Sequence, residues 1–134
     1  MTHFESAVPQ FTVKDVVATA EYYRDVLGFT IAGYWNGEEV TFESDPLPVF
    51  GIVKRDEVRV HFSRAEGSPG GTGRAEDAYD CYFHITGVEE FAVGVKSRGA
   101  EILEGPADRI YGQREIVIRD CNGLILAFGE STSK

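Results

Sequence analysis

Two short segments of the sequence place side chains that can do chemistry at alternate positions. The polar or reactive members are Arg59, His61 and Ser63 within residues 58–63, and Asp80, Tyr82 and His84 within residues 80–85. An imidazole can act as a general base or bind a metal ion, and a carboxylate can bind a cation. These side chains are therefore the first candidates for a ligand-binding or catalytic surface.

Alternation of this kind is typical of strands that turn one face toward a core. Residues 9–13 show the same pattern, with Phe11 and Val13 on the core side. The face away from the core is predicted to carry Gln10, Thr12, Arg59, His61, Ser63, Asp80, Tyr82 and His84. We interpret this set as the wall of a ligand cleft. An antiparallel sheet that leaves one face to water accounts for the pattern equally well.

The elements that position these strands occur twice along the chain. Asp15 is placed to cap a helix over residues 16–27, which Gly28 ends, and residues 86–89 resemble a capping box before a helix over 88–98, which Gly99 ends. Each helix follows one strand and precedes three more, so the sequence predicts a duplicated βαβββ unit and an α+β fold.

The predicted organisation is a single domain of two modules, residues 7–63 and 79–130, with a cleft between them. A glycine-rich segment, residues 64–78, reads as the linker. The later strands are predicted at residues 29–35, 49–54, 58–63, 101–104, 114–119 and 124–130, with a loop over 36–48 and a hairpin turn at Asn122-Gly123.

Composition narrows the class of partner. The 134 residues include 13 Lys and Arg against 22 Asp and Glu, and a net charge of −9 argues against nucleic acid. We find no run of about 18 apolar residues and no leader-like N-terminus, which argues against a membrane and predicts a cytoplasmic protein. Cys81 and Cys121 read as reduced thiols, Cys81 as a small buried one.

Four motifs resemble the vicinal oxygen chelate superfamily, which includes glyoxalases, bleomycin-resistance proteins and dioxygenases. They are Val13–Asp15 (VKD), Glu21–Phe29 (EYYRDVLGF), Tyr111–Glu115 (YGQRE) and Arg119–Gly123 (RDCNG). The likeness extends over residues 7–130 and implies paired βαβββ modules that form a curved mixed sheet bearing a cleft. Cys121 departs from the usual proline.

The resemblance implies where a metal would bind in the metal-dependent members. Those four positions, on the first, fourth, fifth and eighth strands, are Val8, His61, Asp80 and Ala127 here. Valine and alanine cannot ligate, and a stable site usually needs three or more protein ligands. We therefore expect no metal cofactor, with His61 and Asp80 as the residual candidates for a divalent cation; the two could instead form a charged pair.

The metal-free bleomycin-resistance proteins share the opening seen at Ser6–Pro9 (SAVP). The resemblance implies a homodimer that sequesters a cationic drug between aromatic and acidic side chains. The aromatic candidates are Trp35, Phe42, Phe50, Tyr82 and Tyr111, and the acidic ones are Asp80 and Glu43. We expect Phe42 and Phe50 to be core residues, and Trp35 to be either a ligand contact or the anchor of a loop.

Arg114 has two interpretations. It can bind a ligand carboxylate or ring, or it can pair with Glu115 or a neighbouring acid. The predicted ligand-binding set is Gln10, Trp35, Arg59, His61, Asp80, Tyr82, Tyr111 and Arg114.

The predicted function is sequestration of a small, cationic or aromatic ligand, which is not an enzymatic role. The alternative is a lyase or dioxygenase-like enzyme that acts on a carbonyl or phenolic substrate, with His61 as base or metal ligand. A third reading is an accessory domain whose cleft binds nothing.

Overall fold

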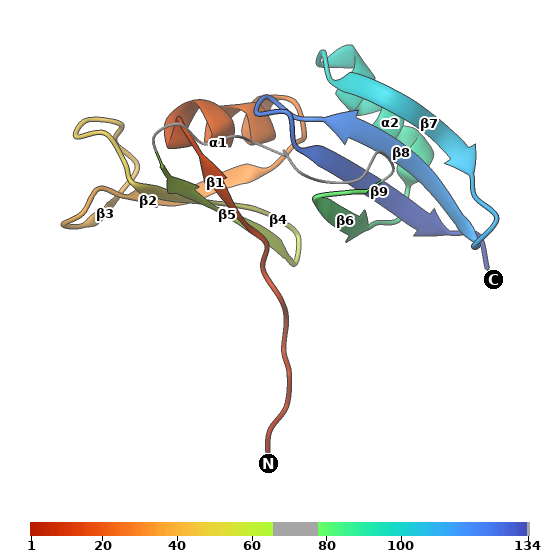
Figure 1. The fold of residues 1–134 in the computed structure, drawn as a ribbon, viewed down its shortest axis with the longest axis horizontal. Helices are drawn as coiled ribbons and strands as arrows, with labels where there is room; N and C mark the ends of the chain where they lie inside the picture. The colour runs from red at the N-terminus through yellow and green to blue at the C-terminus, as the bar shows by residue number, and fades with distance from the viewer. Residues whose placement is uncertain (66–77, 134) are drawn as a thin grey trace. The chain divides into compact units, whose positions relative to one another are not determined.

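A computed structural model describes residues 1–65 and 78–133 (Figure 1). The chain forms two compact units: Met1–Arg24 with Phe29–Ser68, and Asp25–Gly28 with Pro69–Lys134. Residues 25–28, which belong to the first predicted module (7–63), group with the second unit. Most of the predicted linker, residues 66–77, lies outside the described residues. None of the described helices is long and apolar enough to cross a membrane.

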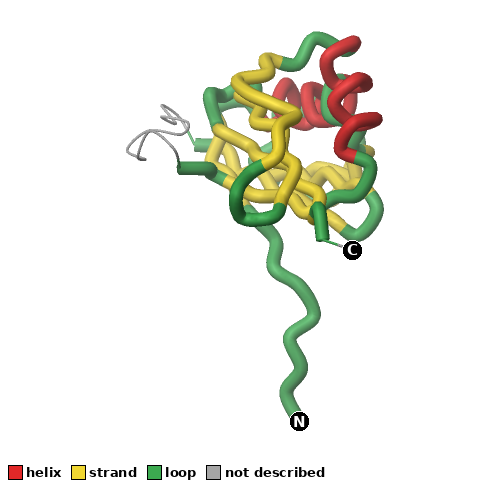
Figure 2. Tube along the Cα trace, turned by 90° about the vertical axis from the view of Figure 1, so that its right-hand side faces the viewer, coloured by secondary structure: helices red, strands yellow, loops and turns green. Residues whose placement is uncertain are grey.

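The first unit contains one helix and a five-stranded mixed sheet in the order β1-β5-β4-β2-β3. Strand β1 pairs parallel with β5, and the other pairs are antiparallel. The residues before β1 form an extended segment that leads into the strand (Figure 2). The elements are β1 (Gln10–Val13), α1 (Val16–Asp25), β2 (Thr30–Trp35), β3 (Val40–Thr41), β4 (Phe50–Arg55) and β5 (Val58–Arg64).

The second unit repeats the plan with a four-stranded mixed sheet in the order β6-β9-β8-β7. Strand β6 pairs parallel with β9, and the antiparallel pairs β9-β8 and β8-β7 complete the sheet. One face of this sheet packs against α2, which contacts β7, β8 and β9. The elements are β6 (Cys81–His84), α2 (Val88–Ser97), β7 (Glu101–Asp108), β8 (Gln113–Arg119) and β9 (Ile125–Ser131). The predicted α+β fold and duplicated unit are confirmed.

Helix α1 begins as the sequence predicts. Oδ1 of Asp15 accepts the backbone N–H of Ala18 at 2.9 Å, which satisfies one of the free donors of the first turn. After the helix, Gly28 adopts a left-handed conformation with φ of 81°. A residue without Cβ takes that conformation at little cost, so glycine ends the helix here.

Helix α2 begins at Val88, as predicted, but the expected capping box is wrong. Gly87 is the N-cap residue and has no side chain to accept a hydrogen bond. The acceptor comes from β9 instead, where Oε1 of Glu130 takes the N–H of Val88 at 3.1 Å. Tertiary structure thus supplies a cap that the local sequence lacks.

The helix-facing sides of both sheets are buried, as predicted. Phe62 and Val60 of β5 are fully buried, and Phe128 of β9 stacks on Phe83 with ring centroids 4.7 Å apart. The prediction for Cys81 was wrong, because this residue is only half-buried. Phe42 lies just beyond the two-residue strand β3 and is 70% exposed, so it is not a core residue. Phe50 is half-buried.

Two stretches have more strand than predicted. Val40–Thr41 pairs with the end of β2, although the whole of 36–48 was expected to be loop. Strand β7 continues to Asp108, beyond the predicted end at Glu104, because register shifts let it keep pairing with β8. The hairpin between β8 and β9 is confirmed: Oδ1 of Asp120 accepts the N–H groups of Asn122 and Leu124.

Candidate functional site

The outer face of the second sheet, the face away from α2, carries a buried carboxylate. Arg114 of β8 contacts Glu89 of α2, which shows that this residue and its alternate neighbours face the helix. Glu115 therefore points to the opposite face, where its side chain is 0% exposed. An unpaired buried carboxylate would be costly, so its partners define the site.

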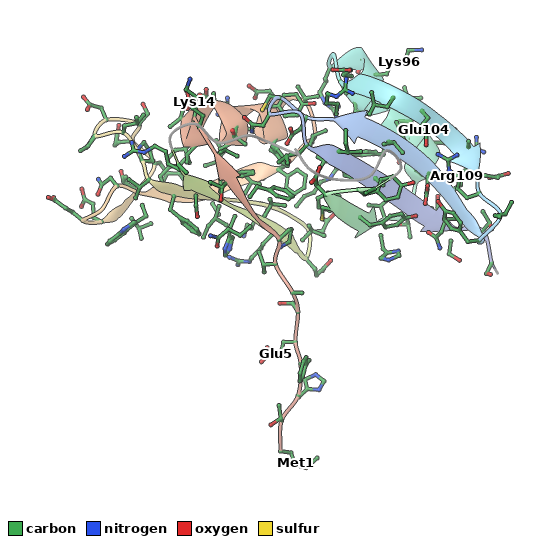
Figure 3. All side chains as sticks on the ribbon, in the orientation of Figure 1. Met1, Glu5, Lys14, Lys96, Glu104 and Arg109 are labelled. Atoms are coloured by element: carbon green, nitrogen blue, oxygen red, sulfur yellow. The ribbon has the colours of Figure 1, made fainter. Side chains whose placement is uncertain are left out.

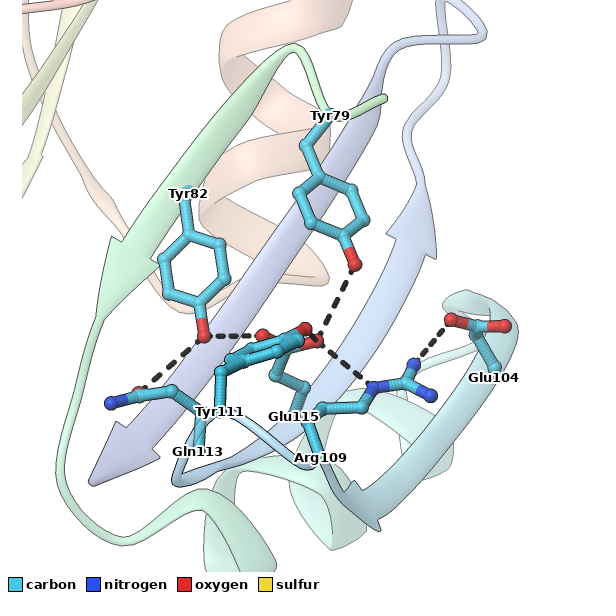
Figure 4. Close-up of polar contacts among 7 residues, drawn as sticks. All are labelled: Tyr79, Tyr82, Glu104, Arg109, Tyr111, Gln113 and Glu115. Carbon is cyan, nitrogen blue, oxygen red and sulfur yellow. Dashed lines mark hydrogen bonds and ion pairs between the residues drawn. The ribbon is translucent and has the colours of Figure 1, made fainter. Parts of the chain in front are cut away.

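Four donors converge on Glu115 (Figure 4). The Tyr82 hydroxyl donates to Oε2 at 2.5 Å, and the Tyr111 hydroxyl donates to Oε1 at 2.7 Å. Arg109 Nε donates to Oε1 at 3.1 Å, and the Tyr79 hydroxyl lies 3.4 Å from the same oxygen. We call these five residues the tyrosine-carboxylate cluster.

The cluster rests on an apolar floor. Val117, Ile125 and Ala127 are buried together on this face, and Tyr79 and Tyr82 pack against them. The Tyr79 and Tyr82 rings are tilted with centroids 5.9 Å apart. The rings are thereby held from below by packing and at the hydroxyl end by hydrogen bonds.

Gly129 of β9 makes room for Tyr82. A Cβ at this position would lie 2.0 Å from the Tyr82 hydroxyl and 2.8 Å from its Cζ. The Tyr82 side chain therefore crosses β9 at Gly129 to reach Glu115 on β8, where its hydroxyl also lies 3.4 Å from Oε1 of Gln113. A larger residue at 129 would block this path.

Burial and hydrogen bonding together set the protonation states of the cluster. Burial alone raises the pKa of Glu115, but donation from Tyr82, Tyr111 and Arg109 outweighs it and leaves the pKa below its ordinary value. Burial, and then the hydrogen bond to Glu115, raise the pKa of Tyr82 and of Tyr111 well above the ordinary value. At neutral pH the carboxylate is ionised and both phenols keep their protons.

Arg109 joins the cluster to a second carboxylate. Its Nη2 donates to Glu104, and Figure 3 labels both residues on the second unit. Glu104 is 55% exposed whereas Arg109 is 25% exposed, so the pair lies at the rim and Glu115 at the centre. The guanidinium thus balances the charge of Glu115 from a position near the surface.

Four predicted ligand-binding residues lie in the second unit. Tyr82 and Tyr111 meet at Glu115. Asp80 has a structural contact, since its Oδ2 accepts the N–H of Ile125 at 2.7 Å. Arg114 lies on the helix side and pairs with Glu89 and with Asp108, not with Glu115, which agrees with its alternative interpretation as a partner of a neighbouring acid.

The other four lie in the first unit. Gln10 donates to Oγ of Ser63 at 2.7 Å. His61 is half-buried, and its ring meets Phe50 edge-on at 5.2 Å. Trp35 is 39% exposed at the end of β2, and Arg59 is exposed on β5. Binding by all eight residues, and the shared cleft, stay predictions.

The comparisons with known proteins agree on one family. The model of the Glyoxalase/Bleomycin resistance protein/Dioxygenase superfamily matches residues 2–128. This chain belongs to that superfamily. Virulence protein STM3117 of Salmonella typhimurium is 27% identical over 124 residues, which cover 89% of this chain and 78% of the relative.

Solved structures share the fold of this superfamily member. The bleomycin resistance determinant encoded on transposon Tn5 has a TM-score of 0.70 and 20% identity, covering 97% of this chain and 100% of that chain. TioX from Micromonospora sp. ML1 has a TM-score of 0.72 and 15% identity, covering 96% and 99%. At these identities the likeness establishes the architecture.

The residues at the four positions that the family resemblance implies as metal ligands do not fit a metal ion. Two of them, Val8 and Ala127, have no donor atom, and Ala127 belongs to the apolar floor of the outer face. Asp80 already accepts a backbone N–H. Within the described residues, no group of three or more His, Cys, Asp and Glu side chains is placed to hold a metal ion.

Sequence reasoning missed the centre of the site. It treated Glu115 only as a partner for Arg114, and it did not single out Tyr79, Arg109 or Gln113. One signal was available: the apolar residues Ile116 and Ile118 alternate with Glu115, so a core-facing isoleucine row places the carboxylate on the outer face.

Proposed function

We propose that this chain binds and sequesters a small, aromatic or cationic organic ligand in the cytoplasm, as a homodimer and without a complete metal site. Drug resistance by sequestration is the corresponding cellular role. The observation that carries the proposal is the tyrosine-carboxylate cluster, three tyrosine side chains gathered on one buried carboxylate at the outer face of a sheet.

Rigid aromatic rings suit stacking with a planar ligand. Tyrosine offers a large contact area with few rotatable bonds, and the face of its ring attracts a cation. Tyr82 is fixed by its floor and by Glu115, while Tyr111 is 57% exposed and donates to the same carboxylate. One ring is therefore set into the sheet, and another is accessible from solvent.

The residues at the metal positions favour binding over metal-assisted catalysis. Only two of the four can donate to a metal ion, whereas the aromatic residues lie close together on one described face. The net charge of −9 also favours cationic ligands over anionic ones. The structural likeness to the Tn5 bleomycin resistance determinant supports bleomycin as the first compound to test.

Isothermal titration with bleomycin and with 9-aminoacridine, a planar cation, tests the proposal. We expect heat of binding from at least one compound, and weaker binding in Tyr111→Ala. Ile110→Ala is the matched control, because Ile110 is the neighbouring residue and is fully exposed. An absence of heat with both compounds, or equal binding by both variants, would contradict the proposal.

The second candidate function is an enzyme that uses His61 as base. The observation in its favour is that Phe50 holds the half-buried imidazole edge-on, at a defined position on β5. Stoichiometric metal in the purified protein, together with turnover of a carbonyl or phenolic substrate that His61→Ala abolishes, would establish this alternative.

A further inference from the structure

The three phenols of the tyrosine-carboxylate cluster share one acceptor. A phenol has a single proton, and an ionised carboxylate can only accept hydrogen bonds. The two shortest contacts, 2.5 Å from Tyr82 and 2.7 Å from Tyr111, therefore place both phenolic protons on Glu115. The Tyr79 hydroxyl, 3.4 Å away, is directed to the same carboxylate.

This arrangement decides which further hydrogen bonds the phenolic oxygens can form. Once a phenol has donated its proton, its oxygen can form further hydrogen bonds only as an acceptor. We infer that the cluster selects ligands that donate hydrogen bonds, such as aromatic amines and amidines, and discriminates against those that present only acceptors, such as aromatic carboxylates. This inference rests on the proposed function, for which it names the ligand class.

The nearby cation does not reverse this preference. Arg109 donates Nε to Glu115 and Nη2 to Glu104, so two carboxylates already neutralise its guanidinium. A ligand carboxylate would have to compete with both. The neighbouring amide of Gln113 is neutral and lies beside Tyr82. The ring of His84 lies tilted against Tyr82 with centroids 5.0 Å apart, and among the contacts described here no unpaired guanidinium or ammonium group faces the phenols.

Glu115 acts in this scheme as a positioning residue. Its side chain is 0% exposed, so it does not meet the ligand. It fixes the direction of the phenolic protons, so the phenolic oxygens can act toward a ligand only as hydrogen-bond acceptors. Burial raises the pKa of Glu115, but the hydrogen bonds that it accepts outweigh burial and lower this pKa. Glu115 is therefore ionised at neutral pH, and the arrangement persists there.

The test compares two planar probes of the same ring system, 9-aminoacridine and acridine-9-carboxylate, by titration at pH 7. The wild-type protein should bind the amine at least about tenfold more tightly, because an unpaired acceptor facing an acceptor costs that much or more. In Glu115→Gln the new amide can donate a hydrogen bond to a phenolic oxygen, and the phenolic proton is then free to point toward the ligand. The ratio of the affinities for the amine and the carboxylate should therefore fall toward one.

Glu104→Gln is the matched control. It removes the same charge from the same arginine, but Glu104 accepts no phenolic proton among the described contacts. It should keep the wild-type ratio. If both variants change the ratio equally, bulk charge explains the preference and the inference is overturned.

Tyr111→Phe keeps the test decisive if Glu115→Gln does not fold. Tyr111 is largely exposed, and the substitution keeps its ring while removing one acceptor. The amine should bind several-fold more weakly, whereas the carboxylate should not. Equal affinity of the two probes for the wild-type protein overturns the inference alone, while binding of neither overturns the proposed function and the inference with it.

Discussion

Strands β1, β5 and β4 of the first unit pair in the same register as β6, β9 and β8 of the second, yet the outer faces of the two sheets differ. In the first unit Gln10 of β1 lies opposite His61 of β5. In the second unit Tyr82 of β6 lies opposite Ala127 of β9. The position that carries a candidate imidazole in one unit is therefore filled by a methyl group in the other.

Two residues further along the strands, the second unit carries the ionisable side chain and the first unit does not. Ser63 pairs with Phe50 in the first unit, and Gly129 pairs with Glu115 in the second. At this position β4 of the first sheet carries the aromatic ring of Phe50, whereas β8 of the second sheet carries the buried carboxylate of Glu115. The same backbone plan thus carries few side-chain hydrogen bonds on the outer face of the first unit and a connected hydrogen-bond network on the outer face of the second.

Side-chain reach explains the contrast. Gln10 extends only as far as Ser63, 2.7 Å from Oγ, on the adjacent strand. Tyr82 passes over Gly129 and reaches Glu115 two strands away. A glycine in the intervening strand therefore turns a local hydrogen bond into a network across the sheet. Four predictions test this difference.

The largest effect is expected at the centre of the network. Glu115→Ala leaves Arg109 and two phenols without their buried partner, which should lower the free energy of unfolding by about 3–5 kcal/mol. Glu104→Ala breaks an exposed pair with the same arginine and should cost less than about 1 kcal/mol. Urea denaturation measures both, and similar losses would refute the contrast.

The second prediction concerns the glycine that Tyr82 crosses. Gly129→Ala places a Cβ against the Tyr82 hydroxyl and should destabilise the protein by about 1–3 kcal/mol, because the tyrosine must leave Glu115. Ser63→Ala, at the matching position of the first unit, removes only an exposed hydrogen bond and should cost less than about 1 kcal/mol. Thermal unfolding compares them, and an unaffected Gly129→Ala would show that Tyr82 does not need the space.

The third prediction is a pH dependence. Against the effect of burial, hydrogen bonds lower the pKa of Glu115 in the folded protein. The ionised group thus stabilises the fold above the ordinary carboxyl pKa of about 4.3, and this contribution is lost as the pH falls through the lower folded value. The stability gap between the wild type and Glu115→Gln should therefore be constant near neutrality and narrow in acid. A gap that does not change down to pH 3 would contradict the assignment.

The smallest effect is expected for Arg114, the arginine of the YGQRE motif. Arg114 pairs with Glu89 and Asp108, and both of these acids are exposed. Arg114→Ala should therefore leave binding of 9-aminoacridine unchanged and alter stability least of the variants here. Loss of binding in this variant would restore Arg114 as a ligand contact.

Much of the fold could be read from local patterns. The Asp15 cap, the glycines after both helices and the alternating strands each reflect a short-range preference, and the structure confirms them. The cap of α2 could not be predicted, although its first residue was, because the capping oxygen belongs to Glu130, 42 residues away from Val88. Phe42 was misplaced because hydrophobicity alone does not show that this residue lies just beyond a strand of only two residues and is exposed.

The candidate site divides in the same way. The sequence by itself determined the duplicated βαβββ plan, the family and the position of Tyr82 on the face away from the helix, because periodicity and motifs are local properties. Only the tertiary structure decided that these tyrosines share one carboxylate, since Tyr82 and Glu115 are brought together by a parallel pairing and a glycine gap. Convergence of side chains from β6, β8 and the segments that flank them depends on the order of strands in the sheet, and it leaves no periodic pattern in the sequence.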